Sequence, residues 1–200
     1  MHEVHWVEQV HGCRVVTVRP VARAGGESAS PGLDAVFAGT GDALVTDAPG
    51  LGLTVLTADC GSIALGSEEG VSGAVHAGWR GLLAGVIEQA IDAMRVLGAT
   101  DVTGALGPCI HPECYEFSEA DLAEVAAVYG ERVRGRSGSG RPALDLPAAV
   151  SAALTGGGAR EVTGLPACTA CAAGYFSHRE RGDTGRQALV VWSGARDTTR

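Results

Sequence analysis

The sequence predicts one domain that mixes α-helices and β-strands. Its 200 residues, 46% of them hydrophobic, are enough to enclose one substantial core. Short β-rich runs first follow one another and then alternate with helical patterns along the chain. This order is typical of mixed α and β architectures. We therefore expect residues 1–200 to form a single domain.

The predicted strands are short β-rich runs bounded by Gly, Pro or Asp. In chain order they are residues 15–18, 43–46, 51–57, 73–76, 102–106, 162–165 and 188–192. Apolar residues at helical spacing predict a helix over residues 82–97, which ends at Gly98. Ser118, with Asp121 three residues later, begins a second helix in the manner of a capping box. Asp145 and Pro147 begin a third helix, which ends in the glycine run 156–158.

Two segments rich in Gly, Ser and Arg are predicted to be mobile surface loops. They cover residues 22–41 and 134–142, where little apolar surface is available to offset the entropy of ordering. Each flanks elements too short to bury a core alone, so neither is a linker between domains.

Charge and composition exclude several classes of function. The net charge is -8 and the chain contains no lysine, so no Lys/Arg-rich block is available to bind nucleic acid. No stretch approaches the roughly 20 apolar residues of a membrane span, and the N-terminus lacks the apolar run of a signal peptide. We expect a cytoplasmic protein with no membrane partner. Its six cysteines are then thiols or metal ligands rather than disulfides.

Three separate positions carry residue types suited to metal binding or catalysis. His76 ends a predicted strand just before two glycines and a helix, where open sheets place ligands. Cys60 follows Asp59 at the polar end of an apolar run, and His11 lies near the N-terminus. A hydrogen-bonded turn histidine, a buried core thiol and an exposed histidine are the structural alternatives. Together, two imidazoles and a thiolate would leave a tetrahedral zinc ion one open position.

The order of short motifs along the chain resembles one family. The motifs are QVHG, DALVTD, TADC, HAGWRG, GPCI with CYEF, CT, and FSHRERGDTGR, spread over residues 7–192. They resemble the laccase-domain family, also called polyphenol oxidase-like, of the purine nucleoside phosphorylase and adenosine deaminase type. The resemblance implies an α+β fold with a mixed, sandwich-like β-sheet core flanked by helices. It also implies that His11, Cys60 and His76 bind Zn²⁺, with copper as the alternative metal.

The implied substrates are purine nucleosides and inorganic phosphate. The resemblance implies phosphorolysis of adenosine, inosine, guanosine and methylthioadenosine, and deamination of adenosine, which makes the enzyme both a transferase and a hydrolase. Cys60, Asp59 and His76 are the candidate catalytic residues; Asp59 is assigned to proton transfer only because it adjoins Cys60. Arginines suit phosphate through their planar fork. The predicted phosphate-binding residues are Arg80, Arg179, Arg181, Thr184 and Arg186, although a solvated surface loop would explain the C-terminal group equally.

The chain departs from the family pattern in three places. Members usually carry a longer stretch before QVHG, so we expect a shortened N-terminus and a less enclosed site. Gly-Ser follows Cys60 where a proline is usual, and His178-Arg179 replaces a Tyr-Arg pair.

Several rival functions remain open at this point. Six histidines are too few for a multicopper oxidase, yet one copper in the same site would still permit phenol oxidation. Cys60 could instead act as a nucleophile with His76 as base in an amide hydrolase. A zinc deaminase signature at His111 and Glu113, or a four-thiolate zinc site, is a weaker match; the thiolates would be Cys109, Cys114, Cys168 and Cys171. An incomplete site would leave a binding module, and either a monomer or a homodimer is compatible with the sequence.

Overall fold

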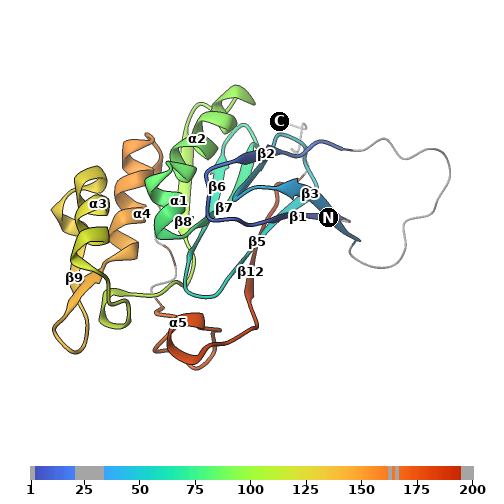
Figure 1. Cartoon of the computed structure of the whole chain (residues 1–200). Coiled ribbons are helices and arrows are strands. Elements are labelled where there is room, and N and C mark those ends of the chain that lie inside the picture. Colours follow the sequence, from blue (N-terminus) through green and yellow to red (C-terminus); the bar gives the residue numbers. More distant parts are fainter. Residues whose placement is uncertain (1–2, 21–33, 162–163, 165–166, 195–200) are drawn as a thin grey trace.

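The computed structural model describes residues 3–20, 34–161, 164 and 167–194 (Figure 1). Its strands form three sheets. The first sheet has the order β12-β5-β1-β3, the second has the order β11-β8-β6-β7-β4-β2, and β10 pairs with β9 in the third. The bounds are β1 (Glu3–Glu8), β2 (Val15–Thr17), β3 (Asp34–Thr40), β4 (Ala43–Thr46), β5 (Leu51–Thr57), β6 (Gly61–Ser67), β7 (Ser72–Ala77), β8 (Val102–Leu106), β9 (Arg134–Arg136), β10 (Pro142–Leu144), β11 (Arg160–Glu161) and β12 (Gln187–Val191).

Both large sheets are mixed. β1 runs parallel to β3 and β5, whereas β12 is antiparallel to β5. In the six-stranded sheet, the central strands β8, β6, β7 and β4 are antiparallel and the outer pairs are parallel. Apolar side chains from both sheets, among them Leu53 of β5 and Leu44 of β4, form one buried cluster between them. The two sheets therefore pack face to face, as the sandwich-like expectation required.

Helices cover the other face of the six-stranded sheet. They are α1 (Trp79–Leu83), α2 (Val86–Val96), α3 (Glu119–Tyr129) and α4 (Leu146–Gly156), with the short α5 (His178–Arg181) and the 3-10 turns η1 (Pro112–Cys114) and η2 (Glu131–Val133). Figure 1 shows α1 to α4 gathered on one side of the strands. Ile87 and Met94 of α2 are fully buried in the larger core with Ile63 of β6. The predicted α+β class is confirmed.

The predicted helix over residues 82–97 is wrong in one respect, because it is two helices. Gly85 lies between them with φ +78°, a left-handed conformation that glycine adopts without steric cost. The other two helix starts are confirmed. Ser118 Oγ accepts a hydrogen bond from the Asp121 backbone N–H, and Asp145 Oδ1 accepts one from the Ala148 N–H. Among the described residues, no helix is both long and apolar enough to cross a lipid bilayer.

Two predicted loops contain strands. Residues 34–40 form β3, which is stabilised by parallel pairing with β1. Residues 134–142 belong largely to the β9–β10 hairpin, in which Glu116 accepts hydrogen bonds from Ser137, Ser139 and Arg141. Strand prediction also omitted β1 and β6. Of the predicted strand at 162–165, only residue 164 is described and it lies in no strand, while residues 162, 163 and 165 lie outside the described part.

Candidate metal centre and active-site pocket

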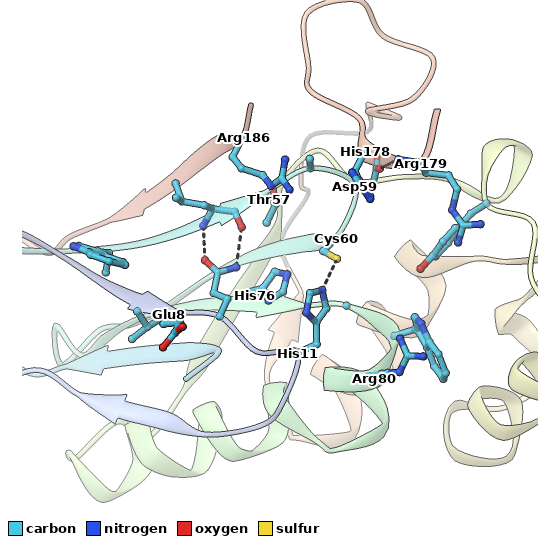
Figure 2. A pocket seen from close by; sticks show the side chains of 18 residues that line it. Glu8, His11, Thr57, Asp59, Cys60, His76, Arg80, His178, Arg179 and Arg186 are labelled. Carbon is cyan, nitrogen blue, oxygen red and sulfur yellow. Dashed lines mark hydrogen bonds between the residues drawn. The ribbon is translucent and has the colours of Figure 1, made fainter. Parts of the chain in front are cut away.

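His11, Cys60 and His76 come together although they are far apart in the sequence. His11 lies in the turn after β1, Cys60 directly precedes β6, and His76 lies on β7. One ligand atom from each lies within 4.8 Å of the other two. Cys60 Sγ is 3.8 Å from His11 Nε2, and the two imidazole rings meet edge to face with their centroids 4.8 Å apart (Figure 2). The predicted ligand set is therefore one spatial cluster.

The chemistry of these donors fits a metal ion. Imidazole nitrogen and thiolate sulfur are ligands that zinc and copper both accept. Three protein ligands leave a fourth tetrahedral position for water or substrate, which distinguishes catalytic from structural zinc sites. The cluster can hold a metal ion, and it lies at the edge of a cavity.

A buried carboxylate that sequence analysis missed holds two of the ligands. Asp42 Oδ1 lies 2.9 Å from His76 Nδ1, which leaves Nε2 of that ring available to bind a metal ion. The same carboxylate accepts backbone N–H groups from His11 at 2.9 Å and Gly12 at 2.8 Å. Asp42 is the first residue of the DALVTD motif, at the start of a buried strand, and that position was its only signal in the sequence.

These contacts set the protonation of the cluster. Burial alone would lower the pKa of His76, but its hydrogen bonds and charge interactions with Asp42 and Cys60 raise it to about 9. Burial would likewise raise the pKa of Cys60, but hydrogen bonds and charges from His11 and His76 lower it to about 6. The pKa of Asp42 is also lowered, because its contacts with His76 and Gly12 outweigh burial. At neutral pH the lowered pKa of Cys60 and the raised pKa of His76 favour a Cys60 thiolate beside a His76 imidazolium.

The backbone around the cluster is constrained. His11 and Asp59 have φ values of 59° and 86°, a conformation that residues other than glycine seldom adopt and that often marks functional sites. There is no room for a side chain at Gly78, because a Cβ there would lie 2.8 Å from His11 Cδ2 and 3.2 Å from Cys60 Sγ. The close approach of the ligands thus requires glycine at position 78.

A cavity of about 650 Å³ adjoins the cluster, which is within the usual range for small-molecule sites. Aromatic side chains of Trp6, Trp79 and Tyr115 line it together with polar groups. The Gln9 side-chain amide exchanges two hydrogen bonds with the Leu56 backbone, both at 2.8 Å, and so continues the pairing between β1 and β5 at the cavity wall. The cavity therefore offers flat apolar surfaces beside the metal-ligand cluster.

Three of the predicted phosphate-binding arginines line this cavity. They are Arg80, Arg179 and Arg186 (Figure 2). The guanidinium carbon of Arg80 lies 4.3 Å from the ring centroid of Trp79, and that of Arg179 lies 5.0 Å from that of Tyr115. Stacking of this kind fixes a guanidinium without using its hydrogen-bond donors.

Arg181 and Thr184 are not among the residues that line the cavity. The Arg181 guanidinium instead donates to the carbonyls of Thr169 and Ala170, at 3.2 and 2.8 Å, and pairs with Asp183 at 3.0 Å. These contacts hold α5 against the turn that contains Thr169 and Ala170.

Asp59 is buried at the cavity wall, and both of its carboxylate oxygens are engaged. Oδ1 accepts a hydrogen bond from Thr169 Oγ1 and Oδ2 accepts one from the Arg179 backbone N–H, both at 2.7 Å. Through these contacts Asp59 connects the turn that carries Cys60 to the segment that carries Arg179.

Residues 1–194 match the family described as multi-copper polyphenol oxidoreductase laccase. The chain belongs to this laccase family. A purine nucleoside phosphorylase of Streptomyces coelicolor is 40% identical over 94% of the chain and 74% of its own length. Another, from Mycobacterium tuberculosis, is 36% identical over 96% of the chain and 72% of its own length. The family assignment made from the motifs is confirmed.

Solved structures show the same laccase-family fold. A protein of Neisseria meningitidis superposes with a TM-score of 0.76 and 29% identity over 96% of the chain and 75% of its own length. YlmD from Geobacillus stearothermophilus superposes with a TM-score of 0.75 and 28% identity over 94% of the chain and 73% of its own length.

Proposed function

We propose that the protein is a zinc-dependent purine nucleoside phosphorylase that also deaminates adenosine. The observation that carries this proposal is that Arg80, Arg179 and Arg186 line the same cavity as the His11–Cys60–His76 cluster. Phosphorolysis needs a phosphate beside the nucleoside, and arginine forks bind phosphate with paired hydrogen bonds. The names of the Streptomyces and Mycobacterium relatives support the same activity.

The residues of the cavity divide into groups suited to each part of a nucleoside. Trp6, Trp79 and Tyr115 offer flat surfaces for the purine, and the arginines would orient phosphate toward the sugar. In phosphorolysis, a phosphate oxygen forms a bond to C1′ while the C1′–N bond breaks and the purine leaves with a proton. In deamination, water adds to C6 and ammonia leaves. A zinc ion held by His11, Cys60 and His76 would supply Lewis-acid chemistry in this cavity.

Product analysis tests the proposal directly. Zinc-loaded protein is incubated with adenosine, with and without phosphate, and adenine, inosine and hypoxanthine are resolved by chromatography. We expect adenine and ribose 1-phosphate only when phosphate is present, and inosine in both conditions. A nucleoside left unchanged in both conditions by fully zinc-loaded protein would refute the proposal. Inosine, guanosine and methylthioadenosine then define the substrate range.

For Asp59 the contacts favour positioning of Arg179 over the proton transfer considered from the sequence. Asp59→Asn puts an amide NH₂ where one oxygen now accepts a hydrogen bond. Loss of one charge-assisted hydrogen bond should raise the KM for phosphate by about tenfold to a hundredfold, with zinc content and deamination kcat little changed. Steady-state kinetics of both reactions measure this.

The control is Asp92→Asn, because Asp92 is largely exposed and pairs with nearby Arg95 on α2. A proton-transfer role would instead lower the deamination kcat by about 10²- to 10⁴-fold and change its pH profile. That result would restore Asp59 to the chemistry.

A second candidate is a thiol hydrolase acting on amides, which the pKa directions at Cys60 and His76 favour. The pKa of Cys60 is lowered to about 6 next to a histidine whose pKa is raised, as in enzymes that use a cysteine nucleophile. Chelation separates the two functions. A chelator would abolish zinc-dependent phosphorolysis, whereas it would expose the thiolate of a hydrolase and leave amide hydrolysis intact.

Copper in the same cluster is the third candidate, because the family description names copper. Metal analysis of protein purified without added metal, followed by phenol oxidation assays on the zinc-loaded and copper-loaded forms, distinguishes it. Phenol oxidation without phosphorolysis in the form that carries the native metal would favour the oxidase.

A further inference from the structure

A second group of thiols lies outside the proposed active site. Cys114 ends η1, and Cys168 and Cys171 lie on a turn more than fifty residues later. One sulfur from each lies within 4.8 Å of the other two, and Cys114 Sγ is 3.1 Å from Cys171 Sγ. Nothing in the proposed reaction uses these three side chains.

The backbone brings the three sulfurs together. Cys168 pairs with Cys109 in an isolated parallel bridge, and the Ala172 N–H donates to the Cys168 carbonyl at 3.0 Å. A helical turn of this kind places residues i and i+3 on the same side, which explains why Cys168 and Cys171 face one another. The Cys114 N–H donates to the His111 carbonyl and fixes η1 opposite that turn.

The spacing of the sulfurs suits a tetrahedral zinc ion. With Zn–S bonds of about 2.3 Å, tetrahedral thiolates lie roughly 3.8 Å apart. The Cys114–Cys171 sulfur separation is 3.1 Å and all three sulfurs lie within 4.8 Å of one another, so these distances fall on either side of that value. The His111 backbone N–H donates to Cys168 Sγ at 3.4 Å, which helps to fix the position of this sulfur. Glu113 Oε1 contacts Cys171 Sγ at 3.9 Å but lies outside the group of three sulfurs, so its side chain would turn toward the other two to become a fourth ligand.

We propose that Cys114, Cys168 and Cys171 hold a structural zinc ion, with Glu113 as the fourth ligand. Four protein ligands close the coordination sphere, which is the pattern of structural zinc sites. On binding, each thiol that becomes a ligand releases its proton to solvent. The site joins η1 to the turn that begins at Cys168.

Two arrangements considered from the sequence fit this region less well. Cys109 is buried, and among the described residues it does not belong to the cluster formed by the other three thiols. The four-thiolate expectation therefore reduces to three. In a zinc deaminase His111 would be a ligand, but here its ring lies 3.8 Å from Glu113 and outside the group. A Cys114–Cys171 disulfide would leave the third clustered sulfur, Cys168, without a role.

The site would stabilise one wall of the active-site cavity. Thr169, which follows Cys168, donates to Asp59, and Asp59 accepts the N–H of Arg179. The Arg181 guanidinium donates to the carbonyls of Thr169 and Ala170 in the same turn. A zinc ion at Cys168 would thus fix the segment on which these contacts depend, without touching substrate.

Metal counting tests the proposal independently of any activity. Protein purified under reducing conditions with zinc, then freed of excess metal, is analysed by inductively coupled plasma mass spectrometry. We expect two zinc ions per chain, one in the C114S/C171S double variant and one in His76→Ala. Cys13→Ser, which removes a free thiol outside both groups, should retain two. Cobalt-substituted His76→Ala should show thiolate-to-cobalt absorption, and adding C114S/C171S to His76→Ala should remove it.

A single zinc ion in the wild type, unchanged in C114S/C171S, would overturn the proposal. So would a mass two hydrogens lower without reductant together with no second metal ion, since that marks a disulfide. If circular dichroism shows that the double variant does not fold, Cys171→Ser alone serves, because Cys171 is exposed. Chelator competition should then show at least a tenfold weaker second site, and an unchanged affinity would count against it.

Discussion

Replacing Asp42 by alanine is expected to weaken zinc binding at the His11–Cys60–His76 site by about 10- to 100-fold. The substitution leaves His76 Nδ1 and the backbone N–H groups of His11 and Gly12 without their acceptor. Since Asp42 is fully buried, removal of one partner of this charged network should also lower the free energy of unfolding by about 3–5 kcal/mol. Competition with a chromophoric chelator and urea denaturation measure the two effects.

Asp47 provides a matched control, because it closes the same DALVTD motif but lies exposed and forms an ion pair 3.6 Å long with Arg19. Asp47→Ala should leave zinc affinity unchanged and alter stability little. Asp42 acts both as a hydrogen-bond acceptor and as the charged partner of His76. Asp42→Asn separates these two roles, because the amide preserves the shape of the side chain and removes its charge. Equal zinc affinity in wild type and Asp42→Ala would show that the ligands are held without this carboxylate.

The sequence allowed the three candidate metal ligands to be named but not Asp42, which contacts two of them. His11, Cys60 and His76 were each ambiguous in isolation, and the family order of motifs grouped them. Asp42 contacts the side chain of His76, which lies 34 residues away in the sequence, and the backbone N–H of His11, which lies 31 residues away. Such contacts leave no local periodicity, so a buried carboxylate at the start of a strand gives almost no signal before the fold is known.

The C-terminal arginines show a similar limit. Arg179 lines the cavity whereas Arg181 faces the carbonyls of the preceding turn, although both belong to the short helix α5. In an α-helix, residues two positions apart point about 200° away from each other. The family resemblance and the concentration of arginines placed both among the predicted phosphate-binding residues. Recognition of Ser177 as the N-cap of a short helix would have separated them, since the Ser177 side chain accepts the Glu180 backbone N–H.

The strands that were missed are those whose stability comes from distant partners. β6 contains two glycines and two serines and has little intrinsic preference for a strand, yet it pairs with β7 on one side and β8 on the other. β3 lies in a glycine-rich region and is held by its parallel register with β1. Strand propensity therefore predicted the apolar strands and failed where pairing decides the structure.

Replacing His76 by alanine is expected to remove one zinc ion per chain together with phosphorolysis. The variant loses a metal ligand, and the loss of several kcal/mol of Lewis-acid stabilisation corresponds to about a 10³-fold lower kcat/KM. The fold should survive with a lower free energy of unfolding, because Asp42 loses its charged partner but still accepts the N–H groups of His11 and Gly12. Metal analysis, nucleoside assays and circular dichroism measure the three outcomes. Active protein without this metal ion would contradict the zinc-dependent mechanism.

A second measurement on the same variant tests the electrostatics of the cluster. In metal-depleted wild type the pKa of Cys60 is about 6, so this thiol is mostly thiolate at pH 7. Without His76 the pKa should rise toward its ordinary value of 9.0, and iodoacetamide should then alkylate Cys60 more slowly at pH 7. His111→Ala is the matched control, because His111 lies outside this cluster and should leave both zinc at His76 and the Cys60 rate unchanged. Equal alkylation rates in wild type and His76→Ala would mean that His11 alone maintains the thiolate.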